Sequence, residues 1–182
     1  VIEIAGMEWL ILDKTEKGYF AILNGFDGEP REFDSDSNNW TESKLRHKLN
    51  TSFRKKITEE LGEDAVVEFD RDLFSLDGQT EYGYCKDKIS LLTVDEYRKY
   101  RKLLPNMGKW WWLLTPWSTP VNDYSSTNTV VSPSGNIYRN NYNNENGVRP
   151  TCITGRQSKC KAEIRYKQMH NLSATDKYKG TK

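Results

Sequence analysis

The chain of 182 residues has few cysteines and histidines, which limits the disulfide and metal chemistry that it can support. Its thiols are Cys85, Cys152 and Cys160, an odd number with no C-x-x-C pair. That pattern suits reduced thiols better than the disulfide framework of a small secreted domain. The histidines, His47 and His170, do not form a zinc site of ordinary ligand spacing. We therefore predict neither a metal ion nor a cofactor.

Long apolar runs are also missing. No stretch approaches the ~18 apolar residues that read as a membrane-spanning helix, so we expect no membrane span. No secretory signal peptide opens the chain, although its first residue is Val1 rather than Met. An export signal cleaved before Val1 stays open as an alternative.

Motifs of the common enzyme classes are absent as well. The chain has no G-x-S-x-G, H-E-x-x-H, P-loop or dinucleotide-binding glycine pattern. Acid pairs such as Asp70 and Asp72 are too common among 26 acidic residues to indicate catalysis. The sequence therefore favours a protein that is not an enzyme.

The chain does contain enough aromatic residues for a folded core. Its mean hydropathy of −0.83 is polar, and its 27 Lys and Arg residues nearly balance 26 Asp and Glu. Aromatic residues reach 12 %, whereas disordered chains are poor in them. A length of 182 residues suits one domain. We expect a folded domain with well-hydrated loops.

Apolar, β-rich stretches predict strands in the first half of the chain. The sequences VIEIAGMEWLILD (1–13) and GYFAILNGF (18–26) are separated by a turn-like TEKG, as in paired strands. The sequences AVVEF (65–69) and KISLL (88–92) predict two further short strands.

Two segments predict helices. Leu45, Leu49 and Phe53 recur every four residues and form one helix face, with Thr41 as the predicted N-cap. A second short helical piece, at about 57–61, is predicted to end at Gly62.

A further helix is predicted over TVDEYRKYRKLL (93–104). Thr93 and Glu96 have the spacing of a capping box. The residues expected to face inward are Val94, Tyr97 and Leu104, and those expected to stop the helix are Pro105 and Gly108.

The segment KWWWLLTPWS (109–118) holds four of the six tryptophans. With the period of two of a strand, Trp110 and Trp112 share one face and Trp111 takes the other. We therefore predict an interior strand covered on both faces, with these three rings in the core. Trp117 follows Pro116 and is the ring predicted to be exposed.

The segment NDYSSTNTVVSPSGNIYRNNYNNENG (122–147) is dense in Asn, Tyr and Ser, and its part TNTVVSPSGNIY (127–138) predicts strand around a Pro-Ser-Gly turn. Antibody loops use this mixture, in which Tyr supplies rigid contact area and Asn and Ser supply adaptable hydrogen bonds. The alternative is that Asn and Gly only build turns in a long polar loop. The predicted ligand-binding residues are Trp117, Asp123, Tyr124, Asn128, Tyr138, Arg139, Asn140, Asn141, Tyr142, Asn143 and Asn144.

Residues 155–182 differ in charge from the rest of the chain. They contain eight Lys and Arg and two acidic residues, a net charge of +6, which leaves −5 on residues 1–154. We predict a domain over 1–154 followed by a basic extension over 155–182. The extension is either a solvated end or an arm that contacts nucleic acid or an acidic partner.

Four stretches together resemble an uncharacterised domain family of bacteria and their phages. The family's motifs are like G-x-x-W-x-V-L-D, W-x-x-S-x-L-R-x-x-L-N, V-F-L-L-S-x-x-E and W-W-W-L-R-S-P followed by G-V-R-P. This chain differs in having Leu114 for Arg and Thr115 for Ser. The matching residues are GMEWLILD (6–13), Trp40, Ser43, Leu45, Arg46, Leu49 and Asn50, KISLLTVDE (88–96), WWWLLTP (110–116) and GVRP (147–150).

The family's end signature is similar to that of the C-type-lectin-like fold shared by formylglycine-generating enzymes and phage diversity-generating variable proteins. The resemblance implies an α+β, C-type-lectin-like mixed fold, with small twisted antiparallel sheets, two helices and long loops. It also implies that Arg149, the family's fixed Arg, bonds strand-end carbonyls or an acid inside the fold.

The function that this resemblance favours is a non-catalytic recognition module of phage or bacterial origin. It would bind a protein, or a cell-surface glycan, through the loop 122–147. One alternative is a copper oxidase of the formylglycine-generating type that uses Cys152, where a free core cysteine is the simpler interpretation. A further alternative is a phage inhibitor of a host protein whose basic tail contacts nucleic acid. The implied location is the bacterial cytoplasm, or the virion or cell surface if an export signal preceded Val1.

Overall fold

The largest sheet is antiparallel and brings the two ends of the described chain together. The computed structural model describes residues 1–155, so most of the predicted basic extension lies outside the described residues. The strand order is β1-β2-β3-β11-β4, and β7 pairs with β11 beside β4. The bounds are β1 Ile2–Ile4, β2 Met7–Lys14, β3 Tyr19–Leu23, β4 Val66–Val67, β7 Ile89–Ser90 and β11 Thr151–Thr154.

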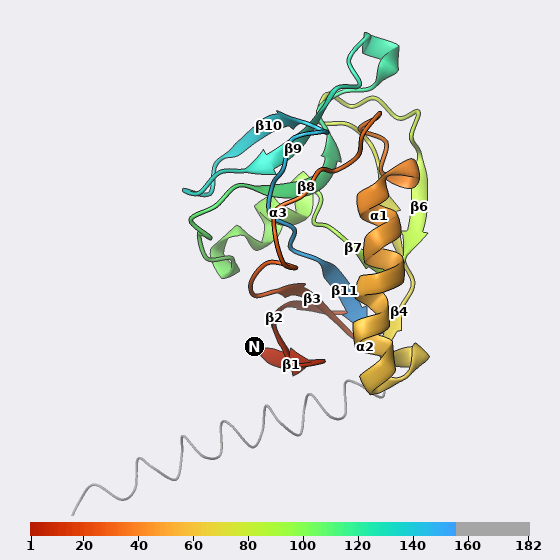
Figure 1. Ribbon diagram of the computed structural model, residues 1–182, viewed down its shortest axis with the longest axis vertical. Coiled ribbons are helices and arrows are strands. Elements are labelled where there is room, and N and C mark those ends of the chain that lie inside the picture. The colour runs from red at the N-terminus through yellow and green to blue at the C-terminus, as the bar shows by residue number, and fades with distance from the viewer. Residues whose placement is uncertain (156–182) are drawn as a thin grey trace, which may run out of the picture.

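Two smaller antiparallel sheets complete the β-structure of residues 1–155. One has the order β10-β9-β8, and the other pairs β5 with β6. Figure 1 shows the main sheet in the lower half of the molecule and the three-stranded sheet above it. The bounds are β5 Phe69–Asp72, β6 Tyr84–Asp87, β8 Trp111–Pro116, β9 Thr127–Val131 and β10 Ile137–Asn141.

One helical run covers residues 44–61, and Figure 1 shows it along one side of the sheets. It consists of α1 (Lys44–Lys48), a π-helical turn η2 (Leu49–Phe53) and α2 (Arg54–Leu61), and it ends at Gly62 as predicted. Leu45, Leu49 and Phe53 are all buried, as the spacing predicts.

The predicted N-cap of this run is wrong by two residues. The hydroxyl of Ser43 accepts the N–H of Arg46 and caps α1. Thr41 instead lies inside the 3₁₀ turn η1 (Trp40–Glu42), which Asn39 caps. Both hydroxyl residues suit a cap locally, and the packing of Trp40 decides between them.

The helix predicted over 93–104 is confirmed in its start and its inner face. It forms α3 (Val94–Tyr100), extended by a 3₁₀ turn η4 (Arg101–Leu103). Thr93 and Glu96 form the capping box, and Val94, Tyr97 and Leu104 are buried. Two further 3₁₀ turns are η3 (Glu63–Ala65) and η5 (Pro120–Asn122).

Asp87 and Asn50 attach the helical run to the strands. The buried Asp87 carboxylate accepts Nε1 of Trp40 at 2.6 Å and Nε of Arg46 at 2.7 Å. The amide of Asn50 accepts the N–H of Ile89 and donates to its carbonyl. The polar residues of the W-x-x-S-x-L-R-x-x-L-N segment are thus accounted for by tertiary hydrogen bonds and a cap.

The G-V-R-P segment links the three-stranded sheet to the main sheet. Gly147 bonds to the backbone on both sides of Trp111, and a Cβ at this position would collide with the ring of Phe26. Val148 lies in the core. Arg149 is fully buried and donates to the carbonyl of Leu23 from Nε at 3.2 Å and from Nη2 at 3.1 Å. The prediction that this Arg bonds a carbonyl inside the fold is confirmed.

These elements confirm a mixed α+β fold with helices and several small antiparallel sheets. The finer, C-type-lectin-like assignment stays a prediction. None of the helices in residues 1–155 is both long and apolar enough to cross a membrane.

Candidate functional site

The segment 122–147 is mostly a β-hairpin rather than a long loop. Strands β9 and β10 pair along their full lengths, and the predicted Pro-Ser-Gly turn joins them. Gly135 has φ +89° in this turn, and a Cβ there would collide with the guanidinium of Arg101. The hairpin therefore holds β10 in a defined position at one edge of the sheet.

The inner strand of this hairpin is not available to a ligand. Every residue of β9 is buried: its backbone lies between β8 and β10, and its alternating side chains are covered on both faces of the sheet. Asn128, a predicted contact residue, has no exposed surface. Its burial removes it from the candidate site.

Trp110 lies on the surface, and its predicted place in the core is wrong. Strand β8 begins one residue later, so Trp111 and Trp112 are buried on opposite faces while Trp110 is 42 % exposed. The Trp110 ring packs edge-on against Tyr138 of β10, with centroids 5.4 Å apart, and Tyr138 is itself 50 % exposed. Two large aromatic side chains thus form an exposed pair.

On the other face of β10, Arg139 lies against two further aromatic rings. Its guanidinium carbon is 5.3 Å from the ring centre of Trp117 and 5.4 Å from that of Tyr124. Trp117 is half-buried rather than fully exposed. Within residues 1–155, no hydrogen bond or ion pair occupies the Arg139 guanidinium. The rings orient the cation and leave its N–H groups for a ligand.

The remaining predicted contact residues divide between structural and exposed positions. Tyr142 is half-buried against the main core, and its carbonyl accepts the N–H groups of Phe33 and Asp34. Asn140 bonds the side chains of Asn144 and Asn146 and thereby closes the end of the hairpin. The exposed positions are Asp123, Asn141, Asn143 and Asn144.

We define the hairpin surface as Trp110, Trp117, Tyr124, Tyr138 and Arg139. All of these except Trp110 are among the contact residues that the sequence predicts. No sequence feature separates Trp110 from Trp111 and Trp112, because the strand could begin at any of them.

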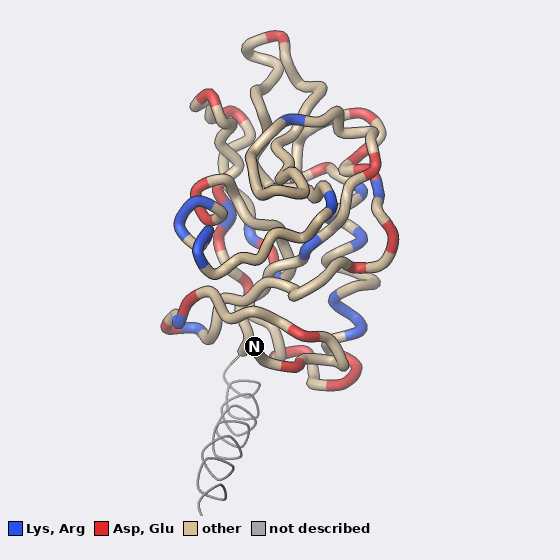
Figure 2. The backbone as a smooth tube through the Cα atoms, turned by 90° about the vertical axis from the view of Figure 1, so that its left-hand side faces the viewer, with Lys and Arg blue, Asp and Glu red and all other residues tan. Residues whose placement is uncertain are grey.

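The hairpin surface lies in the part of the chain that is poor in acids. Residues 1–96 contain 12 Lys and Arg against 22 acidic residues, whereas residues 97–155 contain seven against two. Between 124 and 144 the single charged residue is Arg139. Figure 2, in which the β10 side faces the viewer, shows mainly neutral residues across the upper part of this side and acidic positions at its margins. Arg139 is therefore the one charge within 124–144 and the group of the hairpin surface that can pair with an anion.

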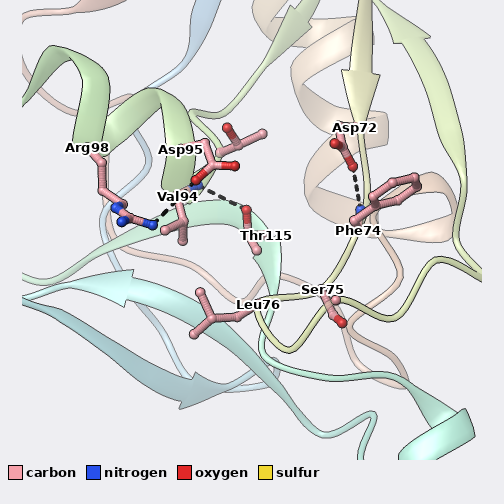
Figure 3. A pocket seen from close by; sticks show the side chains of 10 residues that line it. Asp72, Phe74, Ser75, Leu76, Val94, Asp95, Arg98 and Thr115 are labelled. Carbon is pink, nitrogen blue, oxygen red and sulfur yellow. Dashed lines mark hydrogen bonds and ion pairs between the residues drawn. The ribbon is translucent and has the colours of Figure 1, made fainter.

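Two cavities elsewhere are lined by polar and charged groups, several of which bond to neighbours within the fold. One, of about 330 Å³, lies at the start of α3 (Figure 3). Its polar groups are occupied locally: Asp72 accepts the N–H of Phe74 at 2.7 Å, and Thr115 accepts that of Val94 at 3.0 Å. Arg98 lies 3.6 Å from Asp95.

The second cavity, of about 490 Å³, is lined by charged residues of β2, β5 and α3. Lys99 and Tyr100 both donate to Oδ2 of Asp13, and these hydrogen bonds lower the pKa of that carboxyl. Arg71 pairs with Glu96 at 2.7 Å. The charges in this cavity stabilise the fold through one another.

Cys152 lies in the middle of the main sheet, paired with Ala21 on one side and Ile89 on the other. Complete burial raises the pKa of its thiol to about 12. Since metal binding needs the thiolate, this position argues against the copper-oxidase alternative. Within residues 1–155, no group of three or more His, Cys, Asp or Glu is placed to hold a metal ion. Cys160 and His170 lie outside the described residues.

We expect Cys152 to resist alkylation by iodoacetamide at pH 8 in the native protein and to react fully after unfolding. Cys85, half-buried beside Asp87 with its pKa raised to about 11 mainly by burial, should react slowly. Peptide mapping by mass spectrometry after timed quenching measures both. Rapid native labelling of Cys152 would contradict its placement in a closed core.

No family model matches the sequence, and no match was found among curated proteins or among solved structures. The resemblance to the bacterial and phage domain family stays a prediction of the sequence motifs.

Proposed function

We propose that this protein is a non-catalytic recognition module that binds another protein through the hairpin surface. The observation that carries the proposal is the exposed pair of Trp110 and Tyr138 on one face of β10, with the Arg139 guanidinium on the other face and without a hydrogen bond or ion pair within residues 1–155. Trp, Tyr and Arg are the residue types that contribute most binding energy in protein interfaces. Here they are held by a hairpin and by ring contacts, so little side-chain entropy is lost on binding.

A protein target agrees better with this surface than a glycan does. An exposed ring that stacks on a sugar needs a free face, whereas Trp110 and Tyr138 already pack edge to face. From the sequence resemblance we expect a bacterial protein as target, as for a phage-encoded inhibitor. Whether the basic tail adds contact with nucleic acid concerns residues outside the described part of the chain.

The test is affinity capture from bacterial lysate with the wild-type chain and a Trp110→Ala, Tyr138→Ala variant. We expect the captured amount of a protein that wild type retains to fall at least about tenfold with the variant. The reason is that truncating a residue at the centre of an interface costs ~2 kcal/mol or more of binding energy. The variant should stay folded with a melting temperature lowered by only a few degrees, because each ring is already about half exposed.

Tyr84→Ala is the matched control, because Tyr84 is also an exposed tyrosine (67 %) but lies on β6. It should retain the partner at the wild-type level. Proteins that bind wild type and the double variant equally would contradict the proposal. A glycan retained only by wild type would replace the protein target with a glycan.

A further inference from the structure

Among residues 1–155, no strand pairs with the outer edge of β10, and Figure 1 shows this strand at the outer margin of the described part. The N–H of Ser132 bonds the carbonyl of Asn136, and the N–H of Tyr142 bonds the carbonyl of Ser126. In an antiparallel ladder, alternate residues bond the same neighbour. Residues 136, 138, 140 and 142 therefore bond to β9, and the backbone groups of Ile137, Arg139 and Asn141 point outward.

Two of these three outward residues have backbone groups available for a partner strand. The backbone groups of Asn141 already have local partners. Its N–H donates to the side chain of Asn140, and its carbonyl accepts the N–H of Asn144. Ile137 and Arg139 have no such local partner among residues 1–155. The free edge thus offers two N–H and two C=O groups in line.

Arg139 lies at the centre of this edge, and its charge determines which strands can pair with β10. A second copy of the chain, added antiparallel, would bring its own Arg139 directly or diagonally opposite this one on the same face. Like charges in those positions destabilise a strand pair. No acidic residue lies between 124 and 144 to offset the repulsion. The edge is therefore protected against self-association and open to a strand that carries an acid.

We propose that β10 binds an extended segment of the partner protein as an added antiparallel strand, with an acidic side chain opposite Arg139. This inference rests on the proposed recognition function and states how the partner protein is bound. Backbone bonds to Ile137 and Arg139 would align the segment, and the ring-held guanidinium would take the carboxylate. The acidic residue then lies on the face of Trp117 and Tyr124.

The opposite face of β10 defines the neighbouring positions of the segment. Side chains alternate between faces of a strand, so the residues before and after the acid lie on the side of Tyr138 and Trp110. These exposed rings favour apolar side chains. The segment expected is therefore apolar–acidic–apolar in an extended conformation.

The experiment is selection of random displayed nonapeptides on the full chain, followed by affinity measurement with synthetic peptides. We expect enrichment of Asp or Glu flanked by apolar residues. Changing that acid to its amide should weaken binding about tenfold, as for loss of a hydrogen bond to a charged group. Selection on Arg139→Glu should instead enrich Lys or Arg, whereas Lys48→Glu, the same charge change on the exposed side of α1, should select the wild-type set.

Backbone N-methylation of the selected peptides tests the strand itself. Methylation of the acidic residue's own amide, which faces Arg139, should abolish binding. Methylation one residue away, where the amide points outward, should be tolerated. Hydrogen exchange at the amides of Ile137 and Arg139 should slow in the complex.

Three outcomes would overturn strand addition: no enriched peptide, enrichment without acids, or equal tolerance of both methylated forms. If the Trp110→Ala, Tyr138→Ala variant nevertheless loses a lysate protein, the hairpin surface binds that protein in a way other than strand addition. If the variant retains the protein, both strand addition and the proposed recognition function are wrong.

Discussion

Replacing Arg149 by Met is expected to lower the free energy of unfolding by about 2–3 kcal/mol. The reason lies in Pro150, which lies opposite Leu23 at the end of the antiparallel pair of β11 and β3. The N–H of Leu23 donates to the Pro150 carbonyl at 2.9 Å. An ordinary residue at 150 would donate back, but proline has no N–H. The Arg149 guanidinium supplies the missing donors to the Leu23 carbonyl from Nε and Nη2.

Arg149 carries out this role as a buried cation without a carboxylate partner among residues 1–155. Its guanidinium lies 4.9 Å from the ring centre of Trp111. Burial lowers the pKa of Arg149 to about 10, so the side chain is still charged at neutral pH. Met has a similar length and removes the charge, but it leaves the Leu23 carbonyl buried without a donor. That unsatisfied carbonyl is the main expected loss.

A double-mutant cycle with Pro150→Ala separates the missing donor from the loss of packing. Ala restores a backbone N–H that can bond Leu23. The effect of Arg149→Met should therefore be smaller by about 1 kcal/mol in the Pro150→Ala background. Urea unfolding of the four proteins gives the coupling energy. Additive effects would mean that Arg149 acts through packing alone.

The change Glu96→Ala is expected to destabilise the protein by about 3 kcal/mol or more. Glu96 has two roles at the start of α3. Its carboxylate accepts the N–H of Thr93 in the capping box at 2.9 Å. It also pairs with both terminal nitrogens of Arg71 at 2.7 Å. Arg71 is 2 % exposed, so without Glu96 a buried guanidinium keeps the Leu91 carbonyl but loses its only counter-charge within residues 1–155.

Glu96→Gln distinguishes these roles, because Gln can complete a capping box but cannot neutralise Arg71. If the ion pair dominates, Gln should be nearly as destabilising as Ala. In an Arg71→Met background, Gln should then be tolerated. Thermal or denaturant unfolding measures each variant. A stable Glu96→Gln protein with Arg71 intact would show that the cap, not the charge, is the larger contribution.

Local patterns in the sequence predicted the elements that depend on short-range contacts. The capping box of Thr93 and Glu96 acts over three residues, and the face of Leu45, Leu49 and Phe53 follows from the helix period. The opposite burial of Trp111 and Trp112 follows from the strand period. These predictions are confirmed because neighbours in the chain decide them.

Prediction failed where a boundary or a neighbouring strand decided the outcome. Three consecutive tryptophans do not reveal where β8 begins, and Trp110 lies outside it by one residue. Asn128 belongs to a segment with the composition of a binding loop, yet it lies on a central strand whose side chains are buried on both faces of the sheet. The helix cap moved from Thr41 to Ser43 because the ring of Trp40 bonds Asp87.

By itself, the sequence determined an α+β chain with a strand-forming tryptophan segment, two helical regions and an Asn- and Tyr-rich segment whose single cation is Arg139. Only the tertiary structure decided which strands pair, and that within residues 1–155 the outer edge of β10 has no partner strand. It alone brought Arg139 between Trp117 and Tyr124 and placed Tyr138 on Trp110. Sheet pairing joins residues that lie far apart in the chain, and composition carries no record of which neighbours will cover them.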